Sequence, residues 1–408
     1  MIGFISFWVG VLIKIFTVWF IAIGLFALRR PKRFAQRAPA ARFAVVVAAR
    51  NEAGVIGSLV ESLIKQDYPD ELYDVFVVPN NCSDDTAGAA RRAGATVLTC
   101  PRPVGCKGDV LRDTLSWLMW EKPQYGAYIV FDADNIALPG YLSAMNDALL
   151  AGARVVKGRL KAANPYSSWV AGCYAIYFET FHLLYNRARM SCGLSAKLVG
   201  TGFCVSRDVL IKTHGWNTTT MAEDAEFAAI LAGLGERVYY QPEAVSLDEQ
   251  PLGFSLSLTQ RRRWCSGIMQ AGRLALPSLV KALSLKNPYA LDSVMFFLSP
   301  MAQLLAPVPI LLGGLSFALA PTAIIPAALG LLRLIALSWL TASATAAAVL
   351  IPSGMWDRRM LKGVLTYPIF MASWIPLQFA AFFAPARVWR PIAHSAPPPL
   401  PESAVSGR

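Results

Sequence analysis

Histidine and cysteine, the residues that most zinc sites require, are scarce in this sequence. Among 408 residues there are only three histidines, His182, His214 and His394. The seven cysteines are an odd number and are scattered without the paired spacing of metal-binding motifs. We therefore expect no zinc site, and we expect the cysteines to be reduced, packed side chains on the cytosolic side of a membrane.

Charged side chains are also scarce, and acidic ones are scarcer than basic ones. Charged residues make up 16% of the chain, hydrophobic residues 55%, and the mean hydropathy is +0.43. A soluble protein of this size is normally less apolar, so part of the chain must lie in a membrane. The net charge is +12, and much of the excess adjoins apolar segments, as is typical of a cytoplasmic membrane face with anionic lipids. No nucleic-acid-binding motif accompanies this charge, so no nucleic-acid partner is expected.

The long apolar runs lie at the two ends of the chain. Residues 2–28 can cross a bilayer, and basic residues follow them at once, which is the reverse of the order in a signal peptide. The positive-inside bias then predicts an uncleaved anchor with the N-terminus outside. The expected units are an N-terminal anchor (1–30), a cytosolic catalytic domain (38–250), interfacial helices (251–290), C-terminal transmembrane helices (291–386) and a cytosolic or interfacial tail (387–408).

The last apolar run, residues 361–385, has an ambiguous topology. Basic residues at 358, 359 and 362 precede it, and Arg387 and Arg390 follow it. One spanning helix cannot place both groups on the cytoplasmic side. Either the segment is re-entrant or interfacial, or one basic group faces outward. The runs 291–318 and 322–351 are the other spanning candidates in this region.

Short apolar strands alternate with helical segments in the middle of the chain. The pattern predicts strands at 43–49, 74–78, 96–99 and 128–134, with helices from about 52 to 66 and from 109 to 120. This alternation is typical of an α/β domain with a mostly parallel sheet covered by helices.

Two carboxylates, Asp132 and Asp134, follow the apolar run 128–131. If the strand continues through them, alternation points both side chains the same way at the strand's carboxyl end, where ligands bind in open α/β sheets. Such a pair repels unless a cation lies between them, and Mg²⁺ or Mn²⁺ would suit the oxygen ligands. The alternative is an ordinary loop-capping Asp pair.

Polar turns follow two other predicted strands. The segments 49–52 and 80–85 could bind a nucleotide base and ribose, or they could be ordinary turns rich in Asn, Ser and Asp. Lys107-Gly108 opens a helix and suits phosphate oxygens, although the spacing of a Walker loop is missing. Glu223 and Asp224 could cap a helix, or Asp224 could act as a general base.

A basic cluster, Gln260-Arg261-Arg262-Arg263-Trp264, interrupts the apolar stretch after residue 250. It could anchor lipid headgroups. It could equally place a guanidinium against a pyrophosphate and an indole beneath a sugar.

In this order, the motifs resemble those of membrane-embedded glycosyltransferase family 2 over about residues 40–270, most closely the processive synthases of cellulose, chitin, hyaluronan and poly-N-acetylglucosamine. The set comprises Asn80-x-x-x-Asp84, Lys107-Gly108, Asp132-Ala-Asp134, Gly200-Thr201-Gly202, Glu223-Asp224 and Gln260-Arg-Arg-Arg-Trp264. The resemblance implies a GT-A-like nucleotide-diphospho-sugar transferase fold in a bacterial inner or plasma membrane protein.

The resemblance also implies a role for each motif residue. On the donor side, Glu52, Asn80 and Asp84 would hold uridine, Lys107 would assist at the nucleotide, and Asp132 and Asp134 would bind Mg²⁺ or Mn²⁺ on the diphosphate. Asp224, beside Glu223, would deprotonate the acceptor. The Gly200-Thr201-Gly202 segment would shape the acceptor floor, while Gln260, Arg263 and Trp264 would grip the diphosphate and the terminal sugar. Two residues depart from the family pattern: Asn80 replaces the usual Asp, which puts the uridine contact in doubt, and Ala222 replaces a Thr.

The first functional hypothesis is a processive, inverting β-glycosyltransferase that extends an extracellular polysaccharide from a UDP-sugar and helps to translocate it. The alternative is transfer of one sugar to a membrane lipid, and a third possibility is a catalytically silent scaffold. Trp389 and His394 in the tail could gate the nucleotide site, or they could belong to an interfacial aromatic belt. The identity of the sugar is not encoded in these short motifs.

Overall fold

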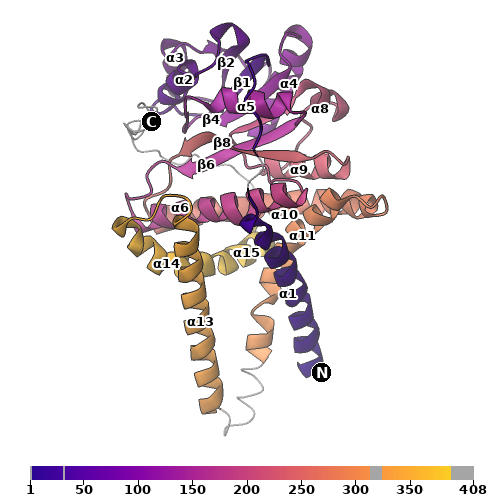
Figure 1. Ribbon diagram of the computed structural model, residues 1–408, viewed down its shortest axis with the longest axis vertical. Helices are drawn as coiled ribbons and strands as arrows, with labels where there is room; N and C mark the ends of the chain where they lie inside the picture. The colour runs from indigo at the N-terminus through magenta and orange to yellow at the C-terminus, as the bar shows by residue number, and fades with distance from the viewer. Residues whose placement is uncertain (1, 31–32, 313–323, 387–408) are drawn as a thin grey trace.

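The computed structural model of the protein describes residues 2–30, 33–312 and 324–386. An α/β domain occupies one end, a layer of helices lies across its base, and long helices project from that layer (Figure 1). The α/β domain and the helical layer are built from segments that alternate along the chain.

A single sheet of eight strands forms the centre of the α/β domain, in the order β3-β2-β1-β4-β7-β6-β8-β5. Strands β3, β2, β1 and β4 are mutually parallel, whereas β7 runs antiparallel to β4 and β6, and β5 runs antiparallel to β8. The strands are β1 (Phe43–Ala49), β2 (Tyr73–Pro79), β3 (Thr96–Val97), β4 (Ala127–Asp132), β5 (Asn135–Ala137), β6 (Val155–Ala162), β7 (Phe203–Ser206) and β8 (Val238–Asp248).

The sheet is mostly parallel, as predicted, because β6 and β8 run in the same direction as β4 and only β5 and β7 run the other way. The strand–helix alternation behind that prediction covers residues 43–134, and both reversed strands come after it. The predicted strand 128–134 is too long, however, because β4 ends at Asp132 and Asp134 lies in the turn before β5. The two carboxylates are thus brought together by a turn rather than by strand alternation.

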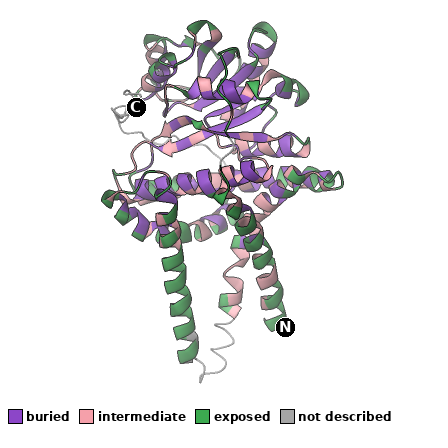
Figure 2. Cartoon of the chain, viewed as in Figure 1, coloured by how far each residue is buried: buried purple, intermediate pink, exposed green. Residues whose placement is uncertain are grey.

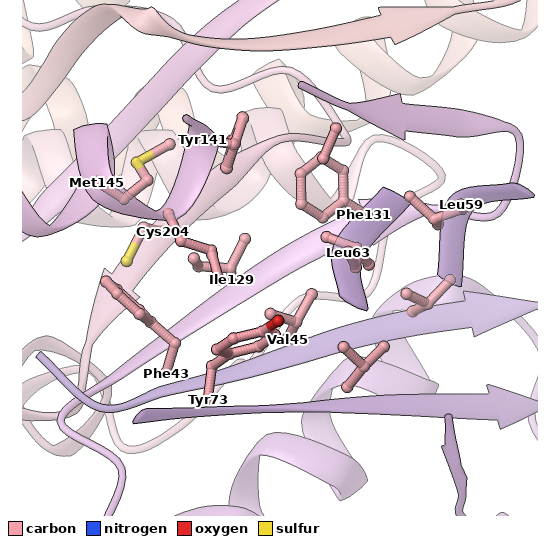
Figure 3. Close-up of a cluster of buried hydrophobic side chains, with 14 of the residues drawn as sticks. Phe43, Val45, Leu59, Leu63, Tyr73, Ile129, Phe131, Tyr141, Met145 and Cys204 are labelled. Atoms are coloured by element: carbon pink, nitrogen blue, oxygen red, sulfur yellow. The ribbon is translucent and has the colours of Figure 1, made fainter. Parts of the chain in front are cut away.

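Side chains of the central strands alternate between two hydrophobic cores, as the two-residue repeat of a strand requires. Val45, Val47 and Ile129 belong to one core, while Val46 and Val130 belong to the other. Figure 3 shows part of the first core. Helices α2 (Ile56–Ile64), α3 (Thr86–Arg92) and α5 (Tyr141–Leu150) pack in the first core, and α4 (Lys107–Glu121), α8 (Arg207–Lys212) and α9 (Glu223–Gly233) in the second.

The helical layer at the base consists of α6 (Trp169–Thr180), α10 (Phe254–Leu283), α14 (Leu361–Ala372) and α15 (Trp374–Phe383). The interfacial helices predicted over 251–290 are one long helix up to Leu283. A π-helical segment, Phe181–Arg187, and α7 (Ala188–Cys192) continue from α6. Helices α6 and α14 approach so closely that a Cβ added to Gly363 would lie 3.3 Å from the backbone of Gly172.

The projecting helices are α1 (Ile2–Gly24), α11 (Pro288–Leu305) and α13 (Ile324–Leu350). By length and composition, four segments of the described chain could cross a membrane: Gly3–Leu28, Pro288–Leu312, Ala328–Leu350 and Arg358–Phe383. These agree with the apolar runs in the sequence. The fourth segment, however, is divided into α14 and α15 and lies across the layer rather than beside the projecting helices (Figure 1).

Candidate active site

Lys107, the first residue of α4, joins three of the sequence motifs. Its Nζ donates to Asp132 Oδ1 at 2.5 Å and to the carbonyl oxygen of Gly200, and it lies 3.5 Å from Glu223 Oε1. Burial alone would lower the pKa of Lys107, but the charges of Asp132 and Glu223 outweigh this effect and raise it. The lysine therefore stays protonated at the centre of an acidic site.

Asp132 is held at the end of β4 by Thr201. The backbone N–H of Asp132 donates to Thr201 Oγ1 at 2.9 Å, and the Thr201 hydroxyl donates to Asn135 Oδ1. Thr201 is only 3% exposed. It therefore fixes the turn that carries the two aspartates, a role that the predicted acceptor floor did not include.

Glu52 lies in the same acidic neighbourhood, directly after β1. Its backbone N–H donates to Thr86 Oγ1 at 2.9 Å. Burial first, and then the charges of Asp134, Asp132 and Asp84, raise the pKa of Glu52 to about 8. A bound cation would relieve the repulsion among these carboxylates.

Glu223 and Asp224 are the first residues of α9. Burial, together with the nearby charges of Asp224 and Asp132, raises the pKa of Glu223 to about 7, although Lys107 opposes the shift. Burial also raises the pKa of Asp224, and Lys197 is the main charge that opposes it. A partly desolvated carboxylate beside a lysine is suited to accept a proton near neutral pH.

Helix α10 supplies the predicted Gln260, Arg263 and Trp264. Burial lowers the pKa of the Arg263 guanidinium, while the charges of Asp132, Glu223 and Asp134 oppose this shift, so Arg263 faces the acidic site. Gln260 and Trp264 lie against α6 instead.

The contacts of Gln260 and Trp264 lie mainly within the helical layer. Gln260 Oε1 accepts a hydrogen bond from the Tyr174 hydroxyl at 2.7 Å. The Trp264 ring meets Tyr174 edge-on and stacks at 27° to Trp374, with ring centroids 6.0 and 6.3 Å away. The indole therefore belongs to an aromatic cluster formed by three helices.

Two predicted uridine contacts, Asn80 and Asp84, are engaged within the protein. The Asn80 Oδ1 accepts from Arg50 Nε, and its Nδ2 donates to the Ala49 carbonyl oxygen, each at 2.9 Å. Asp84 Oδ2 accepts the backbone N–H of Ala53 at 3.0 Å. These bonds match the turn interpretation of segment 80–85, and a uridine contact stays a prediction.

The glycines of the 200–202 segment allow its backbone to pack directly against the residues of the site. A Cβ on Gly200 would lie 3.7 Å from Asp132 Oδ2 and 3.8 Å from Lys107 Nζ, so the backbone borders the charged groups directly. Gly202 has φ +59°, and a Cβ there would lie 3.0 Å from Ser246 Oγ. A side chain at Gly202 would strain both the backbone and the packing.

Sequence reasoning missed Asp248, the last residue of β8. Asp248 Oδ1 accepts from Asn135 Nδ2 at 2.9 Å, and its Oδ2 accepts from Gln250 Nε2 at 2.7 Å. Burial, with the charges of Asp134 and Asp132, raises the pKa of Asp248 well above its usual range. The available signal was its position at a strand end, the same signal that identified Asp132.

The buried Lys157 of β6 was also missed. It is 1% exposed, and its Nζ donates to the carbonyl oxygens of Gly158 and Gly202 at 2.9 and 3.2 Å. Burial lowers the pKa of Lys157 to about 7, while Asp224 and Asp248 oppose the shift. It therefore supports the 200–202 segment from behind.

The donor set fits a divalent cation that is shared with a substrate. In the part of the chain that the structure describes, no three His, Cys, Asp or Glu side chains are grouped so that they could hold a metal ion by themselves. Mg²⁺ is commonly bound by one or two carboxylates together with phosphate oxygens and water. Asp132 and Asp134, with Lys107 and Arg263 nearby, suit that mode.

The two predicted gating residues, Trp389 and His394, lie outside the described residues. Most of the other predicted site residues form two groups. Glu52, Lys107, Asp132, Asp134, Glu223, Asp224 and Arg263 gather at the sheet edge, and Gln260 and Trp264 border it from the helical layer. The arrangement could accommodate a metal-bound diphosphate. The positively charged side chains of Lys107 and Arg263 could hold it, and the buried carboxylate of Asp224 could accept a proton.

Comparison with known proteins identifies a family for the larger part of the chain. The family model described as "Glycosyltransferase like family 2" matches residues 39–267. A β-monoglucosyldiacylglycerol synthase from Trichormus variabilis is 26% identical, with 55% of this chain and 48% of the relative covered. A UDP-forming cellulose synthase catalytic subunit from Pseudomonas fluorescens is 24% identical over 64% of this chain and 37% of its own length. The chain thus spans about half, or less, of the length of these curated relatives.

One solved structure shares the fold over nearly its whole length. The mannosyltransferase PcManGT from Pyrobaculum calidifontis, solved with GDP-Man and Mn²⁺, has a TM-score of 0.61 and 18% identity. The match covers 92% of this chain and 99% of PcManGT. The predicted GT-A-like fold is thereby confirmed.

Proposed function

Because the chain belongs to the glycosyltransferase like family 2, we propose that it transfers a single sugar from a UDP-sugar to a membrane-lipid acceptor. The sequence favoured chain extension with export of a polymer, which would need an enclosed path across the membrane. We favour a lipid acceptor because the projecting helices are exposed.

Among the described residues, none packs closely against residues 328–341 of helix α13. Leu332, Leu337 and Leu340, for example, are 62–66% exposed, and the described residues from 328 to 341 are exposed on every side. Figure 2 illustrates this exposure for α1 and α13. Among the described residues, the projecting helices therefore form no closed conduit, whereas their apolar faces could accommodate lipid tails.

The transfer step follows from the charges at the sheet edge. A divalent cation held by Asp132 and Asp134 would neutralise charge on the departing diphosphate. Lys107 and Arg263 add fixed positive charge at the same place. Asp224 would take the proton from the acceptor hydroxyl, which then attacks the sugar carbon in a single displacement that inverts its configuration.

The acceptor would approach from the helical layer. Trp264 lies one residue after Arg263 on α10 and packs against Tyr174 and Trp374, and an indole face suits the apolar side of a sugar or a lipid headgroup. The similarity to lipid glucosyltransferases is consistent with this direction of approach.

Chain extension is the second candidate function. The Gln260–Trp264 motif and the similarity to a cellulose synthase subunit favour it. It would require that another polypeptide, or residues beyond the described ones, complete the path for the polymer.

For the membrane arrangement, we place the catalytic domain on the cytoplasmic side. The basic residues that follow α1, among them Arg29, Arg30 and Arg33, support this orientation.

The gating hypothesis for the tail is supported by Ala386, whose N–H donates to Ser266 Oγ on α10 at 3.0 Å. If Trp389→Ala leaves turnover and UDP affinity unchanged, the tail is not a gate.

The decisive experiment measures UDP release and product size with the purified protein in lipid nanodiscs. A panel of UDP-sugars and GDP-mannose would be supplied with Mg²⁺ or Mn²⁺ and a bacterial lipid extract. We expect sugar to appear in mono-glycosylated lipid, and the Asp224→Asn variant to lose at least about a hundredfold in UDP release. A ladder of polymer would favour chain extension instead, and full activity of Asp224→Asn would exclude its role as the base.

A further inference from the structure

Residues 358–386 are apolar and long enough to cross a bilayer once, but both of their ends lie at the catalytic domain. At the first end, the guanidinium of Arg359 lies 3.9 Å from the ring centroid of Tyr166. Tyr166 belongs to the loop between β6 and α6, which leads directly from the sheet. The segment therefore starts beside the loop that connects β6 of the sheet to α6 of the helical layer.

The other end returns to the same level along α10. Arg262 donates to the Ala384 carbonyl oxygen at 2.8 Å, and Gln270 Nε2 donates to the Ala386 carbonyl oxygen at 3.2 Å. The same Gln270 accepts the backbone N–H of Met221 at 3.4 Å, two residues before Glu223. The C-terminal end of the segment therefore lies close to the start of α9, which carries Glu223.

A buried arginine fixes the bend between the two ends. The segment breaks at Ser373, between α14 and α15, and Arg261 Nη1 donates to Ser373 Oγ at 2.8 Å and to the Phe370 carbonyl oxygen at 3.0 Å. Arg261 itself is fully buried, and its guanidinium also lies 4.0 Å from the Phe370 ring centroid. A helix break pinned to α10 in this way is incompatible with a straight spanning helix.

The face of the segment that points away from the protein is apolar. On α14 the exposed residues Leu361, Leu365, Ile369 and Ala372 recur at helical spacing, and on α15 Pro376, Phe379, Phe382 and Phe383 do the same. Lys362 and the basic pair before it lie at one end of this face. Such a stripe with basic flanks matches the hydrocarbon–headgroup boundary of an anionic leaflet.

We propose that residues 358–386 form a bent hairpin that lies in the membrane surface and does not cross it. The leaflet on the catalytic side would cover the apolar stripe, and only α1, α11 and α13 would cross. Both basic groups flanking the segment, at 358–362 and at Arg387 and Arg390, would then lie on the same side. This resolves the conflict in the sequence without placing either group outside.

The test uses epitope tags in the full chain and is independent of the sugar chemistry. One tag follows Arg408, a second is inserted in the exposed loop 122–124 of the catalytic domain, and a third lies between α11 and α13. Protease access to each tag is then measured in sealed inside-out and right-side-out membrane vesicles. Retention of nucleotide-dependent thermal stabilisation in each tagged protein verifies that the fold is intact.

We expect the C-terminal tag and the 122–124 tag to be cleaved in the same vesicles, and the tag between α11 and α13 only in the opposite ones. Cleavage of the C-terminal and 122–124 tags in opposite vesicles would show that residues 358–386 cross the membrane and would overturn the proposal. Cleavage of all three tags in the same vesicles would overturn it as well, because α11 and α13 would then not cross.

Discussion

The sheet edge and the helical layer hold their charged residues in opposite ways. At the sheet edge, burial raises the pKa of Glu52, and the charges of Asp134 and Asp132 raise it further. In the helical layer, Arg261 is buried alone among neutral partners and binds a serine hydroxyl and a carbonyl oxygen. The sheet edge is left electrostatically unfavourable without a ligand, whereas Nε and Nη1 of Arg261 are hydrogen-bonded within the layer.

This difference separates function from architecture within one motif. Arg261 and Arg263 are two residues apart on α10, yet Arg263 faces the acidic site and Arg261 locks the bend at Ser373. Substitution of a residue that would bind a ligand should reduce activity. Substitution of a residue that is hydrogen-bonded within the fold should reduce stability.

The largest effect is expected at the sheet edge from Asp134→Asn. Loss of one carboxylate weakens the hold on the cation that neutralises the diphosphate, so UDP release should fall at least about a hundredfold. The melting temperature should stay unchanged or rise, because carboxylate repulsion is relieved. The matched control is Asp208→Asn, an exposed aspartate on α8, which should keep full activity. Metal-dependent activity of normal size in Asp134→Asn would remove this residue from the site.

In the helical layer, Arg261→Met should lower stability by about 2–4 kcal/mol, because the Ser373 hydroxyl and the Phe370 carbonyl oxygen lose a charged donor. Arg262→Met, the neighbouring exposed arginine, should change stability by less than about 0.5 kcal/mol. Thermal unfolding in the same detergent measures both. Equal melting temperatures for the two variants would show that the bend does not depend on Arg261.

A smaller effect is expected in the pH dependence of stability. Since the pKa of Glu52 is raised to about 8 in the fold, the protonated form stabilises the protein at low pH. That contribution is lost as the pH rises from about 5 through 8. Glu52→Gln should flatten the decline in melting temperature over this range, and Mn²⁺ should flatten it in the unmodified protein. An identical decline in the variant and the unmodified protein would mean that Glu52 is not the group responsible.

The sequence was sufficient to predict the strands around the site and most of its acidic residues, because these lie at strand ends within short segments. It predicted a straight continuation through Asp134, since the turn depends on Thr201, a residue far along the chain. The role of Arg261 depends on Ser373, which no local pattern connects to α10. Asp248 was within reach, because it ends a strand as Asp132 does.

The contact between Gly172 and Gly363 has a consequence for the choice of acceptor. It joins α6, which continues from the sheet, to α14, which we place in the membrane surface, with no side chain between the two backbones. That contact then sets the distance between the reaction centre and the bilayer surface. Lipids whose hydroxyl sits at this height would be glycosylated, and those whose hydroxyl lies deeper or farther out would be passed over.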